Sequence, residues 1–312
     1  MTDIGPLEIL KLAIYYASYL YFVAAPIFAW LIIKLNGATR YAMVAALTVI
    51  TCLAYARFIE PRILLSTEHE IALNGCFQKP GAIRIAVFSD THNGLFGNAM
   101  SIRRIAKRVQ AANADFVLIP GDYIYFLHPD RFEETFTAFA DIDAPVFAVL
   151  GNHDLGLPGP DLRVPLREFF SRTGIRLIDD QALKLINNKF AIELVGLSDH
   201  WAQNQKLSLL EGQASIPRLV LTHNPAAVRD FTTDMNADLL IGGHTHGGQI
   251  QLPLLTCWLT GVCGDIAYGL REERGVQIFT TSGTGMVGLP MRFRVPPRID
   301  VLNVSYMACI AS

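Results

Sequence analysis

The longest apolar stretches of the chain lie within its first 65 residues. Residues 12–33 form 22 consecutive positions without a charge, and residues 41–56 form 16 more. The first run is long enough to cross a bilayer as a helix, and the second reaches that length if Arg57 extends its charged end to the interface; otherwise it is a buried or interfacial helix. A usual signal peptide has a shorter apolar region than residues 12–33. The pattern predicts a transmembrane helical hairpin over residues 1–65.

Beyond residue 75 the pattern changes to short apolar runs rich in β-branched residues, each bounded by turn residues or charges. Five of these runs are typical of buried strands, namely Ile83–Phe88, Phe116–Ile119, Val146–Leu150, Leu219–Leu221 and Leu239–Ile241. Helical patterns lie between them, over Ala99–Ala112, Asp130–Ala140, Leu162–Arg172 and the shorter Pro225–Phe231. Alternating strands and helices predict an α/β or layered α/β/α domain over residues 75–312, with residues 60–80 as the boundary region.

A cluster of Asp, Asn or His residues follows each of the five predicted strands. The clusters are Asp90-Thr91-His92, Gly121-Asp122, Asn152-His153-Asp154, His223 and His244-Thr245-His246. Loops that follow strands in open α/β folds meet at one edge of the sheet, so we expect these side chains to lie close together. Imidazole and carboxylate without cysteine suit manganese, iron or zinc. Two such ions that share a carboxylate hydrolyse phosphate esters.

In their order and residue types, the five clusters resemble the calcineurin-like metallophosphoesterase superfamily. The segments 243–249 (GHTHGGQ) and 282–293 (SGTGMVGLPMRF) extend the resemblance to a membrane-associated bacterial branch. That branch includes phosphodiesterases and UDP-2,3-diacylglucosamine pyrophosphatases. The resemblance covers roughly residues 75 to 305. It implies a layered α/β/β/α sandwich, preceded here by the helical hairpin.

The resemblance also implies two metal sites that share one carboxylate. The first would be formed by Asp90, His92, Asp122 and His246, and the second by Asp122, Asn152, His223 and His244, with Asp122 as the bridge. Manganese is the expected metal, with iron or zinc as alternatives. A water between the metals would supply hydroxide near neutral pH. His153 would face the substrate and protonate the leaving oxygen, while Asp154 orients its ring.

The remaining histidines and one further acid fall outside these clusters. His69, His128 and His200 are expected to be ordinary polar residues, with lining of the pocket as the alternative for His128 and His200. Asp199 is expected to be a loop residue or a support for the ligands. Apolar segments at 123–127, 155–158 and 252–259 follow ligand clusters closely. On a membrane-tethered domain they favour a substrate with an acyl or isoprenoid part, although each segment alone is as typical of a core.

Charge and cysteine content narrow the partners and the compartment. The net charge of −2 gives no nucleic-acid footprint, so the expected partners are the membrane and a phosphate-ester or pyrophosphate substrate. Lys11, Arg57 and Arg62 flank the hairpin on the side of the domain, against Lys34 and Arg40 on the other, which slightly favours the cytoplasmic face of an inner membrane. Five cysteines show no framework spacing. Cys257 and Cys263 could pair or remain reduced.

The sequence therefore predicts a membrane-anchored, dinuclear phosphohydrolase acting on a phosphodiester or pyrophosphate, such as a lipid-linked UDP-diacylglucosamine. A broad phosphodiesterase of soluble esters is the first alternative. A non-catalytic membrane scaffold with a relic site is the second, and the complete ligand set argues against it. A protein Ser/Thr phosphatase is disfavoured, because Tyr123-Ile124-Tyr125 follows Asp122 in place of the Asp-Arg-Gly of that branch.

Overall fold

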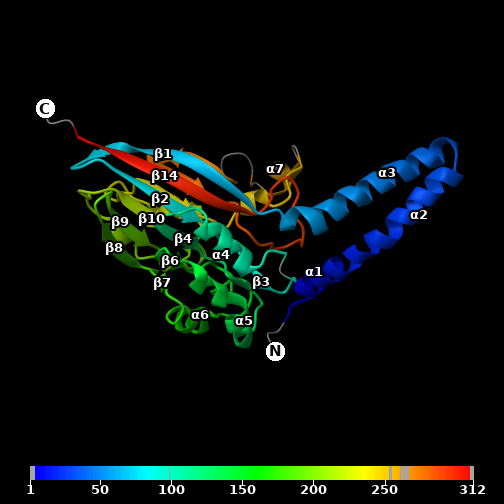
Figure 1. Ribbon diagram of the computed structural model, residues 1–312, viewed down its shortest axis with the longest axis horizontal. Helices are drawn as coiled ribbons and strands as arrows, with labels where there is room; N and C mark the ends of the chain where they lie inside the picture. The colour runs from blue at the N-terminus through cyan, green and yellow to red at the C-terminus, as the bar shows by residue number, and fades with distance from the viewer. Residues whose placement is uncertain (1–3, 98, 253–254, 261, 263–266, 310–312) are drawn as a thin grey trace.

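Two packed β-sheets form the centre of the molecule, and a long helical hairpin projects from one end of them (Figure 1). The computed structural model describes residues 4–97, 99–252, 255–260, 262 and 267–309. The described part of the chain ends with residue 309, at the end of the sheets that is far from the hairpin (Figure 1). The possible pairing of Cys257 with Cys263 lies outside the described residues.

The N-terminal apolar runs form the hairpin that the sequence predicts. Its helices are α1 (Pro6–Ala17), α2 (Tyr21–Lys34) and α3 (Gly37–Ala54), and a 3-10 turn at Ser18–Leu20 joins the first two. The two arms, Pro6–Lys34 and Gly37–Arg62, have 29 and 26 residues. Each is long and apolar enough to cross a membrane. Neither α2 nor α3 buries any residue against the rest of the chain.

The first sheet has the strand order β1-β14-β2-β4-β6-β7. Its strands are β1 (Leu65–Phe77), β14 (Arg298–Ala308), β2 (Gly81–Val87), β4 (Phe116–Pro120), β6 (Val146–Val149) and β7 (Ile175–Leu177). The strands β2, β4, β6 and β7 run parallel to one another. Their carboxyl ends therefore lie on one edge of the sheet.

The second sheet has the order β12-β13-β11-β10-β9-β8. Its strands are β12 (Gly269–Glu273), β13 (Val276–Thr280), β11 (Leu239–Gly242), β10 (Arg218–Leu221), β9 (Ala191–Gly196) and β8 (Gln181–Ile186). Its four central strands are parallel. A two-stranded ribbon of β3 (Asn93–Gly94) and β5 (Ile124–Tyr125) lies apart from both sheets.

Apolar side chains from both sheets meet in a shared core that includes Val87, Leu118, Leu219 and Ile241, all buried. A second core lies between the first sheet and its helices α4 (Ile102–Gln110), α5 (Phe132–Phe136) and α6 (Arg163–Phe170). The outer face of the second sheet is covered by 3-10 helices, including Leu207–Leu210 and Pro225–Asp230. This order of layers confirms the α/β/β/α sandwich.

All five predicted strands are present within two residues of their expected ends, as β2, β4, β6, β10 and β11. The predicted helices are shorter than expected, and the segment at 225–231 is a 3-10 helix over Pro225–Asp230, which Asn224 caps. The segment 60–80, expected as a domain boundary, instead contains β1, which pairs in parallel with β14 from Leu65 onward.

A disulfide joins β1 to the end of the chain. Cys76 is bonded to Cys309 across a sequence separation of 233 residues, whereas Cys52 in α3 is exposed and unpaired. The bond fastens the far end of the β1–β14 pair, where the register shifts between Ala72 and Cys76. The spacing of cysteines along the sequence did not indicate this pair, because the pairing depends on strands that are distant in sequence.

Candidate metal centre

The seven predicted ligands lie on the loops that follow β2, β4, β6, β10 and β11. In the first sheet β2, β4 and β6 are neighbours, and in the second β10 and β11 are neighbours. Because these strands are parallel within each sheet, their following loops gather at one edge of the sandwich. The structure thus brings together all the clusters that the sequence indicates. This edge is the one nearest the base of the hairpin (Figure 1).

The first group comprises Asp90, His92 and His246, whose ligand atoms lie within 4.8 Å of one another. The Nε2 atoms of His92 and His246 are 2.9 Å apart, and the His246 Nε2 is 3.3 Å from Asp90 Oδ1. The His92 Nε2 is also 3.5 Å from Asp122 Oδ2. All four side chains are buried, so their polar atoms face one small volume.

The second group is built on Asn152, His223 and His244. The Asn152 Oδ1 lies 3.1 Å from His223 Nε2 and 3.0 Å from His244 Nδ1. The Asn152 amide nitrogen donates to the Leu157 carbonyl oxygen at 2.5 Å, which turns Oδ1 toward the two rings. The His223 Nδ1 donates to the Pro120 carbonyl oxygen at 2.6 Å, so Nε2 is the ring nitrogen that faces the other predicted ligands.

Asp122 connects the two groups. Its Oδ2 lies 3.5 Å from the His92 Nε2 of the first group and 3.2 Å from the His223 Nε2 of the second. Burial alone would raise the pKa of this carboxyl, but the neighbouring His223 and His153 hold the net pKa well below its ordinary value. Asp122 is therefore a carboxylate at neutral pH, with one oxygen placed between the two groups.

The arrangement fits divalent cations. Burial is the main cause that lowers the pKa of His244 to about 4 and that of His246 well below its usual value. Both imidazoles are thus neutral at pH 7, the form that binds a metal. Their ring nitrogens face His92 Nε2 at 2.9 Å and His223 Nε2 at 3.2 Å beside Asp90 and Asp122, a set of imidazoles and carboxylates that suits a divalent cation.

The backbone at the site has positive φ angles, a left-handed conformation that residues other than glycine rarely adopt. Five of the seven ligands have φ between 42° and 67°, namely Asp90, His92, Asp122, His244 and His246. Such left-handed residues cost of order 1 kcal/mol each and are concentrated at functional sites. The turns point consecutive side chains of the chain into the same small volume, which an extended loop would not do.

Two glycines allow the loops to approach each other. A Cβ on Gly151 would lie 2.2 Å from Asp122 Oδ1, and one on Gly243 would lie 2.6 Å from Asp90 Oδ2. The nearby atoms are those of the predicted ligands themselves, which cannot move without opening the site. The glycines that precede Asn152 and His244 are therefore required by the packing of the ligand loops.

His153 and Asp154 have different surroundings from those predicted. The His153 Nδ1 donates to the Pro158 carbonyl oxygen at 3.2 Å, and Asp154 does not contact the ring through a hydrogen bond within the described residues. Asp154 instead accepts the backbone N–H groups of Asp122, Tyr123 and Gly151 at 2.9–3.0 Å. Asp154 therefore fixes the loop that carries Asp122, because the two oxygens of one buried side chain accept from several N–H donors at once.

His153 also lies closer to the predicted ligands than expected. Its ligand atom and those of His92 and Asp122 are all within 4.8 Å of one another. Its backbone N–H donates to Asp122 Oδ1 at 2.9 Å. The ring is mostly buried, and that burial lowers its pKa to about 4. The geometry suits either contact with a substrate or direct coordination.

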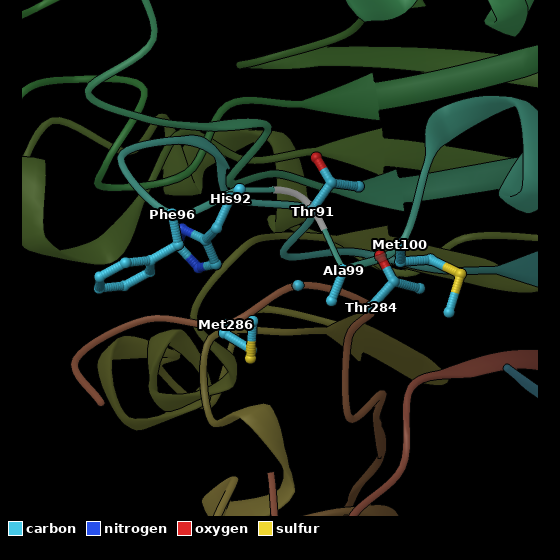
Figure 2. Close-up of a pocket in the computed structure, with 9 residues that line it drawn as sticks. Thr91, His92, Phe96, Ala99, Met100, Thr284 and Met286 are labelled. Carbon is cyan, nitrogen blue, oxygen red and sulfur yellow. The ribbon is translucent and has the colours of Figure 1, made fainter. Parts of the chain in front are cut away.

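A small cavity opens beside His92. It is lined by Thr91, Phe96, Met100, Thr284 and Met286, among others (Figure 2). Three further residues contact the predicted site residues; Tyr125 lies in the apolar segment 123–127 that the sequence associated with the substrate, whereas Trp201 and Arg292 were not indicated as site residues. Tyr125 packs its ring against His153 with centroids 4.9 Å apart, Trp201 packs against His244 at 4.6 Å, and the buried Arg292 lies 3.4 Å from His246 Nδ1. None follows a strand in a ligand-like pattern.

The other histidines pair with carboxylates outside the seven ligands. His69 contacts Asp300 at 3.0 Å, His128 contacts Asp130 at 3.2 Å and His200 contacts Asp230 at 2.9 Å. Asp199 is buried and accepts the backbone N–H of Trp201 at 2.9 Å. It thus holds the short turn that carries the Trp201 side chain toward His244.

This fold and this collection of carboxylate and imidazole ligands define a metallophosphoesterase. The chain belongs to the calcineurin-like phosphoesterase family, which matches residues 83–248. It is 30% identical over 275 residues to the phosphodiesterase YaeI of Escherichia coli, with 85% of this chain and 98% of that one covered. It is thus a phosphoesterase with candidate metal ligands at Asp90, His92, Asp122, His223 and His246.

A second relative is the UDP-2,3-diacylglucosamine pyrophosphatase LpxG of Chlamydia muridarum. It is 24% identical over 310 residues, which cover 81% of this chain and 92% of that one. Among solved structures, phosphopantetheinyl hydrolase from Mycobacterium tuberculosis is 14% identical with a TM-score of 0.42, covering 64% of this chain and 89% of that one.

Proposed function

We propose that the chain is a membrane-anchored phosphohydrolase that uses two divalent metal ions to cleave a phosphodiester or pyrophosphate bond. The observation that carries the proposal is the position of Asp122 Oδ2 between His92 Nε2 and His223 Nε2. The proposed ligands of the first ion are Asp90, His92, Asp122 and His246, and those of the second are Asp122, Asn152, His223 and His244. Manganese is our first choice of metal, with iron or zinc as alternatives.

When bound, such ions activate a water molecule and neutralise the charge of the transferred phosphoryl group. The side chains of the chain itself do the rest. Asp154 fixes the loop that carries Asp122 through three backbone N–H groups. In this proposal the His153 ring faces the substrate and delivers a proton to the leaving oxygen. Trp201, which is 51% exposed beside His244, offers a face for a ring of the leaving group.

We propose that the helical hairpin, which precedes the start of β1 at Leu65, is a membrane anchor. The large exposed apolar side chains of the hairpin include Phe22, Ile27, Trp30 and Ile33, each more than half exposed. A continuous apolar surface on two helices of this length is unstable in water, and a core helix of a soluble protein would be mostly buried. Insertion in a bilayer removes that surface from water.

The proposed substrate is lipid-linked, with a UDP-diacylglucosamine type of molecule as the first candidate. The similarity to a UDP-2,3-diacylglucosamine pyrophosphatase supports it, as does an apolar groove lined by Ile250, Leu252, Leu255 and Leu289. The groove begins at Gly248, two residues after the ligand His246, and Trp258 beyond it is 80% exposed. The alternative of a broad phosphodiesterase for soluble esters is favoured by the similarity to YaeI.

A comparison of soluble and membrane-bound substrates separates these alternatives. We expect full-length protein to hydrolyse a lipid phosphodiester in vesicles, and Trp258→Ser to lower that rate while leaving hydrolysis of a small soluble diester unchanged. Met307→Ser is the matched control, because Met307 is a similarly exposed apolar residue (74%) near the C-terminal end of β14. Equal vesicle rates for Trp258→Ser and Met307→Ser would remove the support for a lipid substrate.

We propose that the catalytic domain faces an oxidising compartment. The count of three against two positive charges favours the cytoplasm only slightly, whereas a disulfide between Cys76 and Cys309 is rare in cytosolic proteins. In spheroplasts, a membrane-impermeant maleimide should label Lys189→Cys, which is exposed on the domain, and should not label Arg40→Cys in the first turn of α3. Both variants carry Cys52→Ser, Cys257→Ser and Cys263→Ser, so that the introduced cysteine is the only one outside the Cys76–Cys309 bond. The reverse labelling pattern would place the domain in the cytoplasm.

A further inference from the structure

The first helix of the hairpin touches the active-site ribbon. α1 lies next to β3 at the base of the hairpin (Figure 1). The Lys11 ammonium donates to the Tyr125 hydroxyl at 2.8 Å and to Glu8 Oε1 at 3.2 Å. Glu8 is 7% exposed and Tyr125 is 1% exposed. A polar chain of three side chains therefore joins the proposed anchor to the loop that follows the bridging Asp122.

Tyr125 passes this contact to the catalytic groups. Its ring stands perpendicular to that of His153, with centroids 4.9 Å apart, and perpendicular to that of His92 at 6.0 Å. The ring cannot shift without disturbing one of these two histidines. Burial raises the pKa of the Tyr125 hydroxyl, so it is a neutral phenol at pH 7. Its oxygen accepts from Lys11, and its O–H points toward Glu8 at 3.4 Å.

A second contact holds α1 in place. The Tyr15 ring stacks on Phe96 at 5.6 Å with an interplanar angle of 15°, and Phe96 in turn packs on Tyr125 at 5.9 Å. The guanidinium of Arg57, from the second arm of the hairpin, lies 4.0 Å from the centre of the Tyr15 ring. Arg57 is 1% exposed. The second arm thus contacts Tyr15 of α1, and Tyr15 reaches Tyr125 beside His153 through Phe96.

The polar contact of Lys11 with Glu8 and Tyr125 adds little net stability to the docking of α1. Lys11 and Glu8 have side chains only 15% and 9% exposed, and the desolvation of such a pair offsets most of its attraction. Apolar side chains at these positions would pack α1 against the domain at least as well. Lys11 supplies instead a directed donor to one hydroxyl, which fixes the position of Tyr125 more narrowly than apolar packing would.

We propose that Lys11 is a positioning residue of the active site, which acts through the Tyr125 hydroxyl to hold the His153 ring. The hairpin is then part of the catalytic site, and the site is complete only when α1 is docked. The inference rests on the proposed function for the role of His153. The geometry of the contact itself is independent of that role.

The test uses the full-length protein in detergent with Lys11→Met, Tyr125→Phe and the double variant. We expect each single variant to lower kcat on an alkyl phosphodiester by about 3- to 30-fold with KM and bound metal unchanged. The double variant should be no slower than Tyr125→Phe, because both changes break one contact. Lys11→Arg should restore most of the rate. Lys34→Met, which removes an exposed lysine at the far end of α2, should have no effect.

A spectroscopic readout separates this inference from the proposed function. In protein with isotope-labelled histidine, the His153 ring signals are identified by their loss in His153→Ala. They should shift in Lys11→Met and Tyr125→Phe, and not in Lys34→Met. Unchanged His153 signals in Lys11→Met, or additive losses of kcat in the double variant, would overturn the positioning role. Shifted signals in a protein that hydrolyses neither diester nor pyrophosphate would uphold the contact and reject the proposed function.

Discussion

Asp122→Asn is expected to release at least one metal ion and to abolish nearly all turnover. Asp122 is 1% exposed, and its Oδ2 faces a histidine of each group at 3.2 and 3.5 Å. The substitution keeps the size of the side chain, but it removes the negative charge that offsets repulsion between two cations. It also places an N–H₂ group where a lone pair was. Because metal-ion catalysis supplies several kcal/mol, we expect kcat to fall on the order of a thousandfold or more.

Elemental analysis of purified protein measures the first effect, and hydrolysis of a soluble diester measures the second. His246→Ala should mainly empty the first site, and His244→Ala the second. Asp130→Asn is the matched control, because the Asp130 side chain is 88% exposed and lies outside the ligand groups. Two full equivalents of metal in Asp122→Asn, together with undiminished activity, would contradict the dinuclear assignment. Low metal content in the unsubstituted protein would favour the scaffold alternative.

The parts of the fold that the sequence predicts are those in which the local pattern and the environment agree. The strands β4 and β6 are buried on both faces, so every residue from Phe116 to Pro120 and from Val146 to Val149 is apolar. The following ligands Asp122 and Asn152 lie within a few residues of the strand ends. Because the ligands directly follow parallel strands, the ends of these strands place them at one edge of the sheet. The convergence of the five loops could therefore be predicted from the sequence.

Strands with mixed polarity were missed for the opposite reason. β1 contains Glu68, His69 and Glu70, and its first six residues alternate between partly buried and exposed positions. It is stabilised by pairing with β14, more than 200 residues away, in the register Leu65↔Arg298. Pairing at this distance leaves no local pattern. The Cys76–Cys309 disulfide was missed for the same reason.

The surroundings of the site were predicted less well than the convergence of the loops that carry the proposed ligands. His153 finds its hydrogen-bond partner in the Pro158 carbonyl oxygen, not in the neighbouring Asp154. Adjacent residues on a tight turn point in different directions, and Asp154 is turned toward the backbone of residues 122–124. Likewise, the contact of Lys11 with Tyr125 spans 114 residues. Main-chain acceptors and contacts between distant segments cannot be inferred from residue types alone.

His153→Ala is expected to lower hydrolysis of an alkyl phosphodiester far more than that of a nitrophenyl ester. An alkoxide is basic and must be protonated as it leaves, whereas nitrophenolate is a stable anion. General acid catalysis of this kind is typically worth about 10²–10⁴ in rate. Burial lowers the pKa of His153 to about 4, so the imidazole is neutral at pH 7 before substrate binds. To act as an acid it must gain a proton when the anionic phosphate arrives, because a nearby negative charge raises its pKa.

The informative quantity is the ratio of the two losses, measured at full metal occupancy. His128→Ala is the control, because the His128 side chain is 57% exposed and its partner Asp130 lies outside the ligand groups. Equal losses on both esters would make His153 an electrostatic contact to the phosphoryl group and leave the proton donor unassigned. Loss of a metal ion would make it a ligand, an outcome that its position within 4.8 Å of the ligand atoms of His92 and Asp122 allows. Retained metal with a tenfold or larger difference between the two losses would establish His153 as the acid, because a ligand or a charge contact alone does not distinguish the basicity of the leaving group.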